Sequence, residues 1–247
     1  MAFVHGKTTS VLVGGYDLTT YLREASVSTD VDVADTSVFG NTYKTGIVGL
    51  GGSSMNFSGL YESSASAIDA TLSTALAASG GTIVTIGFDS SLAIGKRIFT
   101  LDANETSYAV NGSISDVVSV QAAFSARTNL GGKSGVSLHA LAAETSSTNS
   151  ASVDNGAATT NGGWGSLHVT VANRADADET YDIKIQHSTN DSTWADLITF
   201  TQVAASTPQA QNTIVASGTT VNRYLRVVST IAGTTPSITF HANFVRG

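Results

Sequence analysis

Short stretches that alternate between apolar and small polar residues recur along the chain and constrain its fold more than any other feature. From residue 24 to 33, Val27 and Val31 alternate with Ser and Asp residues. Over 54–61, Met55 and the apolar residues that follow it alternate in the same way with Ser and Asn. Successive side chains of a strand point to opposite faces, so this two-residue period predicts strands with one buried and one polar face. The chain is therefore predicted to be mainly β.

The composition agrees with one large β domain or two modest ones. Ser and Thr supply about a quarter of the 247 residues, and charged residues reach only 13%. Both residue types weaken helices, and Thr favours strands, while 41% apolar residues are enough to fill a core. One helix is predicted over 63–79, with Ser63 or Ser64 as its N-cap and Gly80 and Gly81 at its end.

The stretch 144–163 lacks any apolar period and separates two patterned regions. We assign residues 1–147 to a first unit, a β-sandwich or barrel with the one helix, in which Asn111 and Gly112 are predicted to form a type I′ hairpin turn. Residues 148–163 are predicted to be a linker, and 164–247 a second β-sandwich built of short strands.

Several classes of protein conflict with the sequence. The chain has no cysteine, which excludes disulfides and thiolate chemistry, and its net charge of −7 argues against tight binding to DNA or RNA. No apolar run approaches the roughly 20 residues that span a bilayer, so no membrane insertion is expected. The first residues carry no signal-peptide core, so classical export is not expected.

No catalytic residue, metal site or cofactor is predicted. The five histidines lack metal-ligand spacing, and they are interpreted as surface or sheet residues. The glycine-rich stretch 49–54 lacks the lysine of a phosphate-binding loop and leads into a strand, so it predicts a turn or bulge. Asp30, Asp32 and Asp35 do not complete an EF-hand and are interpreted as a solvated strand face.

The stretch 29–50, TDVDVADTSVFGNTYKTGIVGL, followed by MNFSGLY at 55–61, resembles the tail tube (major tail) proteins of long-tailed bacteriophages. The similar pattern is an Asp/Thr-rich strand, a D-T-[TS]-x-F-G-x-T loop, and a glycine-ending strand with an aromatic residue. The resemblance covers about residues 1–140. The second unit, with its segments 185–194 and 223–227, looks like the Ig-like or discoidin-like sandwich that decorates such tubes.

The resemblance implies a structural virion protein whose hexameric rings stack into the tail tube, the conduit for genome ejection into the host cell. Its implied partners are copies of itself, the tail tip or baseplate, the tape measure protein and the tail terminator. DNA is expected to pass through the lumen without specific binding. The implied location is the phage tail, assembled in the host cytoplasm.

Two groups of residues are predicted to carry this function. Val27, Val31, Met55, Phe57, Val118 and Val120 are expected in the core, so the opposite strand faces would line the channel. The lumen residues are Ser26, Ser28, Asp30, Asp32, Asn56, Ser58, Ser119 and Gln121. The loop 34–49 is expected to contact neighbouring subunits or rings through Phe39, Asn41, Tyr43, Lys44 and Ile47, because it places apolar bulk in a glycine-rich connection.

Other readings stay open at this point. The protein could be a carbohydrate-binding surface or secreted protein of two sandwiches, with weak glycan contact through the second unit, or a hydrolase whose site has no recognisable motif. The polar strand faces could meet bulk solvent outside a tube, and Phe39 and Tyr43 could fold back onto their own core. If the second unit only decorates the tube, a fragment of residues 1–147 should still assemble.

Overall fold

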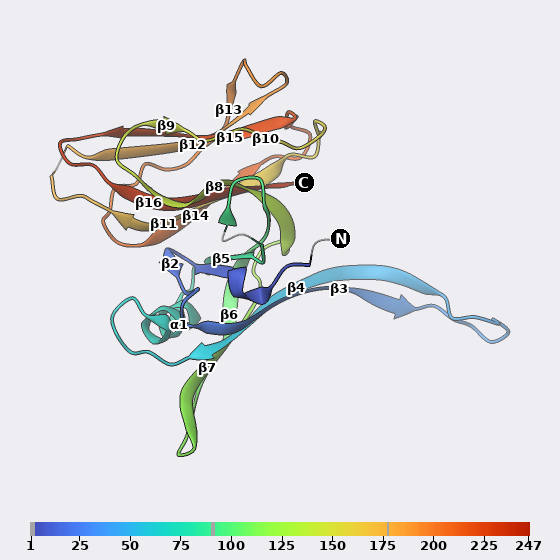
Figure 1. Ribbon diagram of the computed structural model, residues 1–247. Coiled ribbons are helices and arrows are strands. Elements are labelled where there is room, and N and C mark those ends of the chain that lie inside the picture. The colour runs from blue at the N-terminus through green and yellow to red at the C-terminus, as the bar shows by residue number, and fades with distance from the viewer. Residues whose placement is uncertain (1–2, 90–91, 177) are drawn as a thin grey trace.

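The computed structural model describes residues 3–89, 92–176 and 178–247 and consists almost entirely of strands (Figure 1). Strands hold 56% of the chain and helices 5%, which confirms the prediction of a mainly β protein. In the described ranges no helix is long and apolar enough to cross a membrane. The elements in chain order are η1 (Gly6–Thr8), β1 (Ser10–Val13), β2 (Tyr16–Asp17), β3 (Leu22–Asp35), β4 (Gly46–Leu60), α1 (Ile68–Ala77), β5 (Thr82–Gly87), β6 (Arg97–Ser113), β7 (Asp116–Ala126), β8 (Lys133–Glu144), β9 (Thr148–Asn149), β10 (Val153–Asp154), β11 (Gly163–Ala172), β12 (Thr180–Ser188), β13 (Ala195–Thr199), β14 (Gln209–Val215), β15 (Tyr224–Ala232) and β16 (Ile238–Arg246).

The first unit is built on the antiparallel strands β3, β4, β7 and β6, which lie side by side in that order. The helix α1 packs against β6. On the side of β6 away from β7, the strands β5 and β1 continue the sheet. Phe57 and Phe124 meet in the core with ring centroids 5.6 Å apart, beside the fully buried Met55, Ile68 and Leu72. The alternating residues of β4 and β7 therefore supply one wall of this core.

The helix is shorter at its start than predicted. It begins at Ile68, and its N-cap Ala67 makes no side-chain capping bond, so the expected cap by Ser63 or Ser64 is wrong. The reason is local: the Glu62 carboxylate accepts hydrogen bonds from the Ser64 backbone N–H at 2.9 Å and from its hydroxyl at 2.6 Å, which holds these residues in a turn. The helix ends at Ala77, close to the predicted glycines.

The two turn predictions in the first unit have different outcomes. The β6–β7 hairpin turns at residues 114–115, because Ser113 pairs with Asp116 and Asn111 still lies within the ladder opposite Ser119. The predicted Asn-Gly turn is therefore wrong by three positions. The glycine-rich stretch 49–54 does contain a bulge, since the β3–β4 register shifts between the pairs Val31–Gly51 and Val33–Val48.

The second unit is a two-layer sandwich (Figure 1). One layer contains β14, β11, β16 and β8, and the other contains β10, β15, β12 and β13 with β9 at its side. Tyr181 and Leu225 from one layer meet Phe240 and Phe244 from the other in a core of fully buried side chains. The predicted sandwich of short strands is present here.

The strand β8 belongs to both units. Its residues 133–136 pair with β6 of the first unit, and its residues 136–144 pair with β16 of the second. The stretch predicted to be a linker is also held in place, because β9 and β10 both pair with β15 and Thr159 bridges to Val221. Hydrogen bonding thus continues from one unit into the next.

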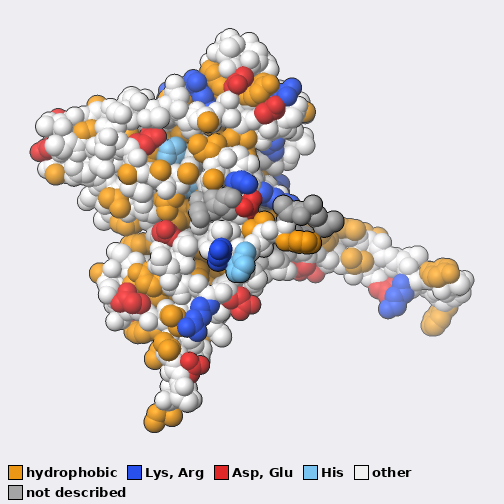
Figure 2. Space-filling view, viewed as in Figure 1, with side chains coloured by type: hydrophobic (Ala, Val, Ile, Leu, Met, Phe, Trp, Pro, Cys, Tyr) orange, Lys and Arg blue, Asp and Glu red, His pale blue; other side chains and the backbone are white. Residues whose placement is uncertain are grey.

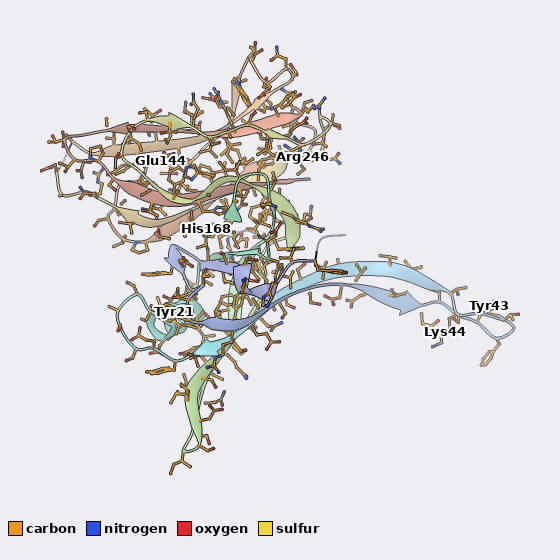
Figure 3. All side chains as sticks on the ribbon, viewed as in Figure 1. Tyr21, Tyr43, Lys44, Glu144, His168 and Arg246 are labelled. Carbon is orange, nitrogen blue, oxygen red and sulfur yellow. The ribbon has the colours of Figure 1, made fainter. Side chains whose placement is uncertain are left out.

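A buried polar seam joins the two units where their sheets face each other. His168 of β11 is fully buried; its Nε2 lies 2.8 Å from Thr85 Oγ1 and its Nδ1 lies 2.6 Å from the Gly14 carbonyl oxygen. Thr100 Oγ1 lies 2.9 Å from Thr85 Oγ1 and 3.4 Å from Ser166 Oγ (Figure 3 labels His168). Burial lowers the pKa of His168 to about 4, so the seam is neutral at pH 7.

Candidate assembly surfaces

One face of the four-stranded sheet β3–β4–β7–β6 is polar. Residues that pair directly across antiparallel strands share a face. Ser26 lies opposite Asn56, and Ser58 lies opposite both Glu24 of β3 and Gln121 of β7. The register and the two-residue period place all eight predicted lumen residues on this one face: Ser26, Ser28, Asp30, Asp32, Asn56, Ser58, Ser119 and Gln121.

The structure adds members that the sequence patterns did not single out. Glu24, Ser54 and Ser125 share the polar face, and β6 contributes Asn104 and Asn111 opposite Ser125 and Ser119. A plain two-residue period would have placed Asn104 and Asn111 on opposite faces, because the β6 register shifts between Glu105 and Ser107. The charged residues of this face are Glu24 and Asp30 at paired positions and Asp32, which follows Asp30 by the two-residue period, so its charge is acidic.

Both sides of this four-stranded sheet end in free edges. Among the described residues β3 pairs with β4 alone, and over 104–113 β6 pairs only with β7, because its ladder with β5 ends at Ala103. A strand edge presents unpaired N–H and C=O groups that can accept another strand. Since the four strands alternate in direction, β3 and β6 run opposite ways, and an edge-to-edge contact between copies would be antiparallel.

The hairpin of β3 and β4 projects from the first unit as a long arm, which we define as residues 28–53 (Figure 1). Val31 is 50% exposed, and Val33 and Val48, which pair with each other, are exposed as well. The expectation that Val31 lies in the core is therefore wrong. The same expectation is wrong for Val118, which is 37% exposed. Met55, Phe57 and Val120 are buried as expected, and Val27 is partly buried.

The arm tip, residues 37–45, carries four of the five predicted contact residues, and none of them is buried in a core. Phe39 is fully exposed and Tyr43 is 84% exposed, so neither ring folds back onto its own unit. Figure 3 shows Tyr43 at the far end of the arm. Asn41 and Lys44 are also exposed, and Ile47 lies just below the tip at 66% exposure. In the space-filling view, apolar side chains gather at this far end (Figure 2).

A second apolar tip was missed by the sequence patterns. The β6–β7 hairpin also projects from the body, and apolar side chains lie at its end (Figures 1 and 2). Ile114 at its turn is fully exposed, and Val110 and Val117 are about half exposed. Large exposed apolar side chains on projecting hairpins are typical of surfaces that contact another protein. The first unit thus presents two apolar tips, two free strand edges and one acidic polar face.

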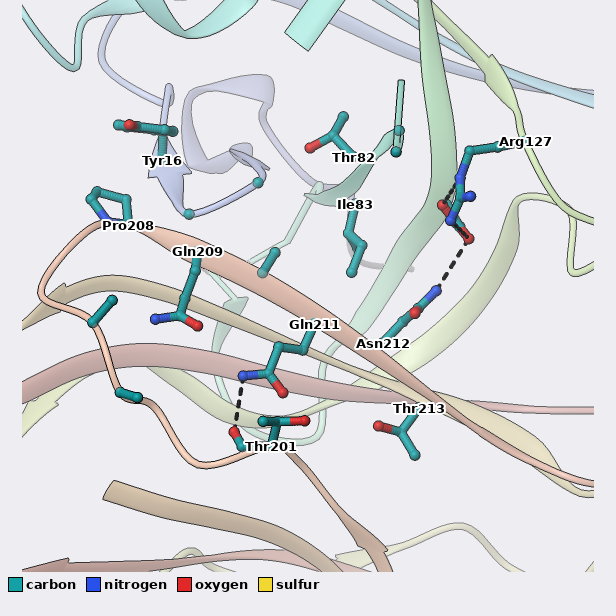
Figure 4. A pocket seen from close by; sticks show the side chains of 18 of the residues that line it. Tyr16, Thr82, Ile83, Arg127, Thr201, Pro208, Gln209, Gln211, Asn212 and Thr213 are labelled. Carbon is teal, nitrogen blue, oxygen red and sulfur yellow. Dashed lines mark hydrogen bonds and ion pairs between the residues drawn. The ribbon is translucent and has the colours of Figure 1, made fainter. Parts of the chain in front are cut away.

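A cleft of about 790 Å³ lies between the two units, lined by Tyr16, Gln209 and Gln211 among others (Figure 4). In its wall, Arg127 binds the buried Asp102 through two hydrogen bonds of 2.9 Å, and Asn212 of β14 donates to the same carboxylate at 3.2 Å. Arg127 and Asn212 therefore both bind the one carboxylate of Asp102. They tie the first unit to the edge strand of the second.

Glu105 is the one carboxylic acid with a strongly raised pKa among the described residues of the first unit. Its side chain is directed to the core side of β6, opposite Phe124, and only 7% of the residue is exposed. Neither carboxylate oxygen has a hydrogen-bond partner, and burial raises the pKa of Glu105 to about 8. The native state therefore holds this side chain protonated at pH 7.

Glu105→Gln should remove a pH dependence of stability. The unfolded chain releases the Glu105 proton above about pH 4.5, whereas the native state keeps it until about pH 8. Native stability therefore falls as pH rises through this window. In Glu105→Gln the free energy of unfolding should exceed that of the wild type at pH 9 by on the order of 2 kcal/mol and match it near pH 4. Denaturant unfolding measures this, with the exposed Glu24→Gln as control; an unchanged pH profile in Glu105→Gln would contradict it.

No known protein family matches the sequence, and no curated protein matches it. Solved structures show partial similarity. A chain of the virion of a native gene transfer agent particle is 14% identical, covers 50% of this chain and 94% of its own, and has a TM-score of 0.39. A chain from the tail of an empty gene transfer agent particle, with C6 symmetry, is 15% identical with the same coverage and a TM-score of 0.40. The SPP1 Dit protein, described as a hub adsorption apparatus in phages infecting Gram-positive hosts, is 11% identical over 96% of this chain and 99% of its own, with a TM-score of 0.35.

Proposed function

We propose that this protein is a non-enzymatic structural subunit of a phage-type tail, and that its copies form hexameric rings that stack into a tube for genome passage. The four-stranded sheet with two free edges and one acidic polar face carries the proposal. If β3 of one copy pairs with the outer edge of β6 in the next, the ladder continues antiparallel from copy to copy. Such a head-to-tail contact closes a ring when its rotation closes.

The polar face suits the inside of such a ring. Lys and Arg side chains grip phosphates, and each contact adds a salt-dependent affinity for DNA. The carboxylates of Glu24, Asp30 and Asp32 instead repel the DNA phosphates, and the small hydroxyls and amides carry no positive charge that would bind them. DNA could therefore move along this face without binding. Within the virion, the tube's partners would be the tape measure protein, the tail tip or baseplate and the terminator.

Purified protein should show this assembly directly. Negative-stain images of the concentrated wild-type chain are expected to contain rings with a central hole, single or stacked. Sedimentation should report a species about six times the 25.3 kDa chain. A chain that stays monomeric at every concentration would contradict the proposal.

Lysines on the polar face should make the tube retain DNA. Asp30→Lys with Asp32→Lys reverses the charge of two exposed strand residues without touching the core, so tubes should still form. Each copy gains two cations, and DNA should be retained at low salt and released steeply as salt rises. The measurement is DNA retention by isolated tubes, or ejection rate in particles that carry the variant.

Asp182→Lys with Asp191→Lys is the matched control, because it makes the same charge change in the second unit. Equal DNA retention by both double variants would show that Asp30 and Asp32 do not face the DNA.

A weak glycan contact is the function we propose for the second unit. The Arg226 guanidinium lies 4.2 Å from the centroid of the Trp194 ring and donates a hydrogen bond to Gln186 Oε1 at 2.8 Å. Gln186 Nε2 in turn donates to Asp196 Oδ1 at 2.7 Å. An aromatic ring beside planar polar groups, all fixed on one outer sheet face, offers both stacking and hydrogen bonds to a sugar.

A further inference from the structure

A groove of about 420 Å³ lies between α1 and the turn that joins β1 to β2. Its lining consists mainly of small residues, such as Gly14, Ala70, Ala75 and Ala78, and also includes Tyr16. The groove is lined entirely by the first unit. A bulky side chain from outside could enter it without displacing a large one.

Two polar features of this groove lack partners within the described chain. Thr71 lines it, is only 6% exposed, and its hydroxyl has no hydrogen-bond partner. Buried hydroxyls are nearly always paired, so this one indicates a missing donor or acceptor. In addition, the last turn of α1 carries no basic residue, which leaves the negative end of the helix dipole without a compensating charge.

The arm tip has the complementary features. It carries the exposed ring of Tyr43, with a hydroxyl that can donate and accept, and beside it Lys44, which is the one charged residue of the tip. The tip points away from its own body, whereas α1 lies on the opposite side of the first unit (Figures 1 and 3). A chain therefore cannot fill its own groove, but a second copy can.

We propose that the groove beside α1 receives the arm tip of a second copy of this chain. Tyr43 enters the groove with its hydroxyl on Thr71 Oγ1, and Lys44 lies at the C-terminal end of α1. The contact joins two different surfaces at opposite sides of the molecule, so it is head-to-tail and propagates through a ring or between rings. This inference rests on the proposed function and specifies the surface that receives the arm.

Two neighbouring helix positions offer a matched test. Ser73 and Thr74 are both exposed, and each donates its hydroxyl to the carbonyl four residues earlier at 2.7 Å, but only Thr74 lines the groove. Thr74→Trp should obstruct the groove and reduce assembly at least tenfold by sedimentation, whereas Ser73→Trp should assemble like the wild type. Tyr43→Phe keeps the ring and loses only the hydroxyl, so it should need about five- to tenfold more protein to assemble.

Cross-linking tests the contact itself, since the chain has no native cysteine. With a short bismaleimide, Thr42→Cys combined with Ala78→Cys should give a ladder of covalent multimers, and Thr42→Cys combined with Ser73→Cys should give few. Normal assembly of Thr74→Trp, or equal ladders from both cysteine pairs, would overturn the groove as the docking site while the proposed tube stands. A wild-type chain that never assembles would contradict both the groove contact and the proposed tube.

Discussion

Phe39→Ser combined with Tyr43→Ser is expected to abolish assembly and leave a folded monomer. Both rings are exposed in the single chain, so the substitutions remove no core contact and should change the free energy of unfolding by less than about 0.5 kcal/mol each. In an assembled tube the same rings would be buried. Burial of a large apolar side chain contributes about 2 kcal/mol, so each contact should weaken by about 4 kcal/mol, or roughly a thousandfold.

Sedimentation across a concentration series measures this loss, and thermal unfolding checks that the monomer is intact. Ile214→Ser is the matched control, because Ile214 is 61% exposed on β14 of the second unit and belongs to neither projecting hairpin. The control should assemble normally. Rings or tubes from the double variant at wild-type concentration would show that the arm tip makes no essential contact.

A fragment of residues 1–147 is expected to fail to fold, although the sequence patterns suggest a boundary there. Its last strand, β8, would lose β16 as a partner over most of its length. The face with Thr85 and Thr100, which is fully buried against Ser166 and His168, would become exposed. The fragment would lose a sheet partner and one wall of its buried surface together, and such losses exceed the stability of an ordinary domain.

Circular dichroism and denaturant unfolding check this expectation. The full chain should unfold cooperatively, and the fragment should show no cooperative transition and should aggregate. A soluble 1–147 fragment with a sharp transition, or one that assembles into rings, would show that the second unit is an independent decoration.

The alternating sequence pattern predicted which residues share a strand face, because that relation depends only on the two-residue period of a strand. It could not predict which faces another element covers. Val31 continues the pattern of Val27, yet it is exposed because the arm extends past the body of the unit. The exposure of Ile114 has the same origin, since the hairpin turns later than its Asn-Gly pair suggests.

Contacts between residues far apart in the chain could not be predicted from the sequence either. His168 was interpreted as an ordinary sheet histidine, and it does lie in a strand, but its partners Gly14 and Thr85 lie 154 and 83 positions away. The double role of β8 depends likewise on pairing with β16, about a hundred residues later. Local periodicity contains no information on such pairings. For the same reason, the pairing of β9 and β10 with β15 could not be predicted from the sequence of the stretch 148–163.

The orientation of the sheet β3–β4–β7–β6 in an assembled tube tests the central proposal most directly. Cryo-electron microscopy of tubes formed by the wild-type chain, at a resolution that separates strands, measures it. We expect a continuous barrel in which β3 of one copy pairs with β6 of the next, with Ser28, Asp30 and Gln121 facing the lumen. Tubes in which these residues face outward, or copies joined through the second unit with both strand edges free, would contradict the proposed function.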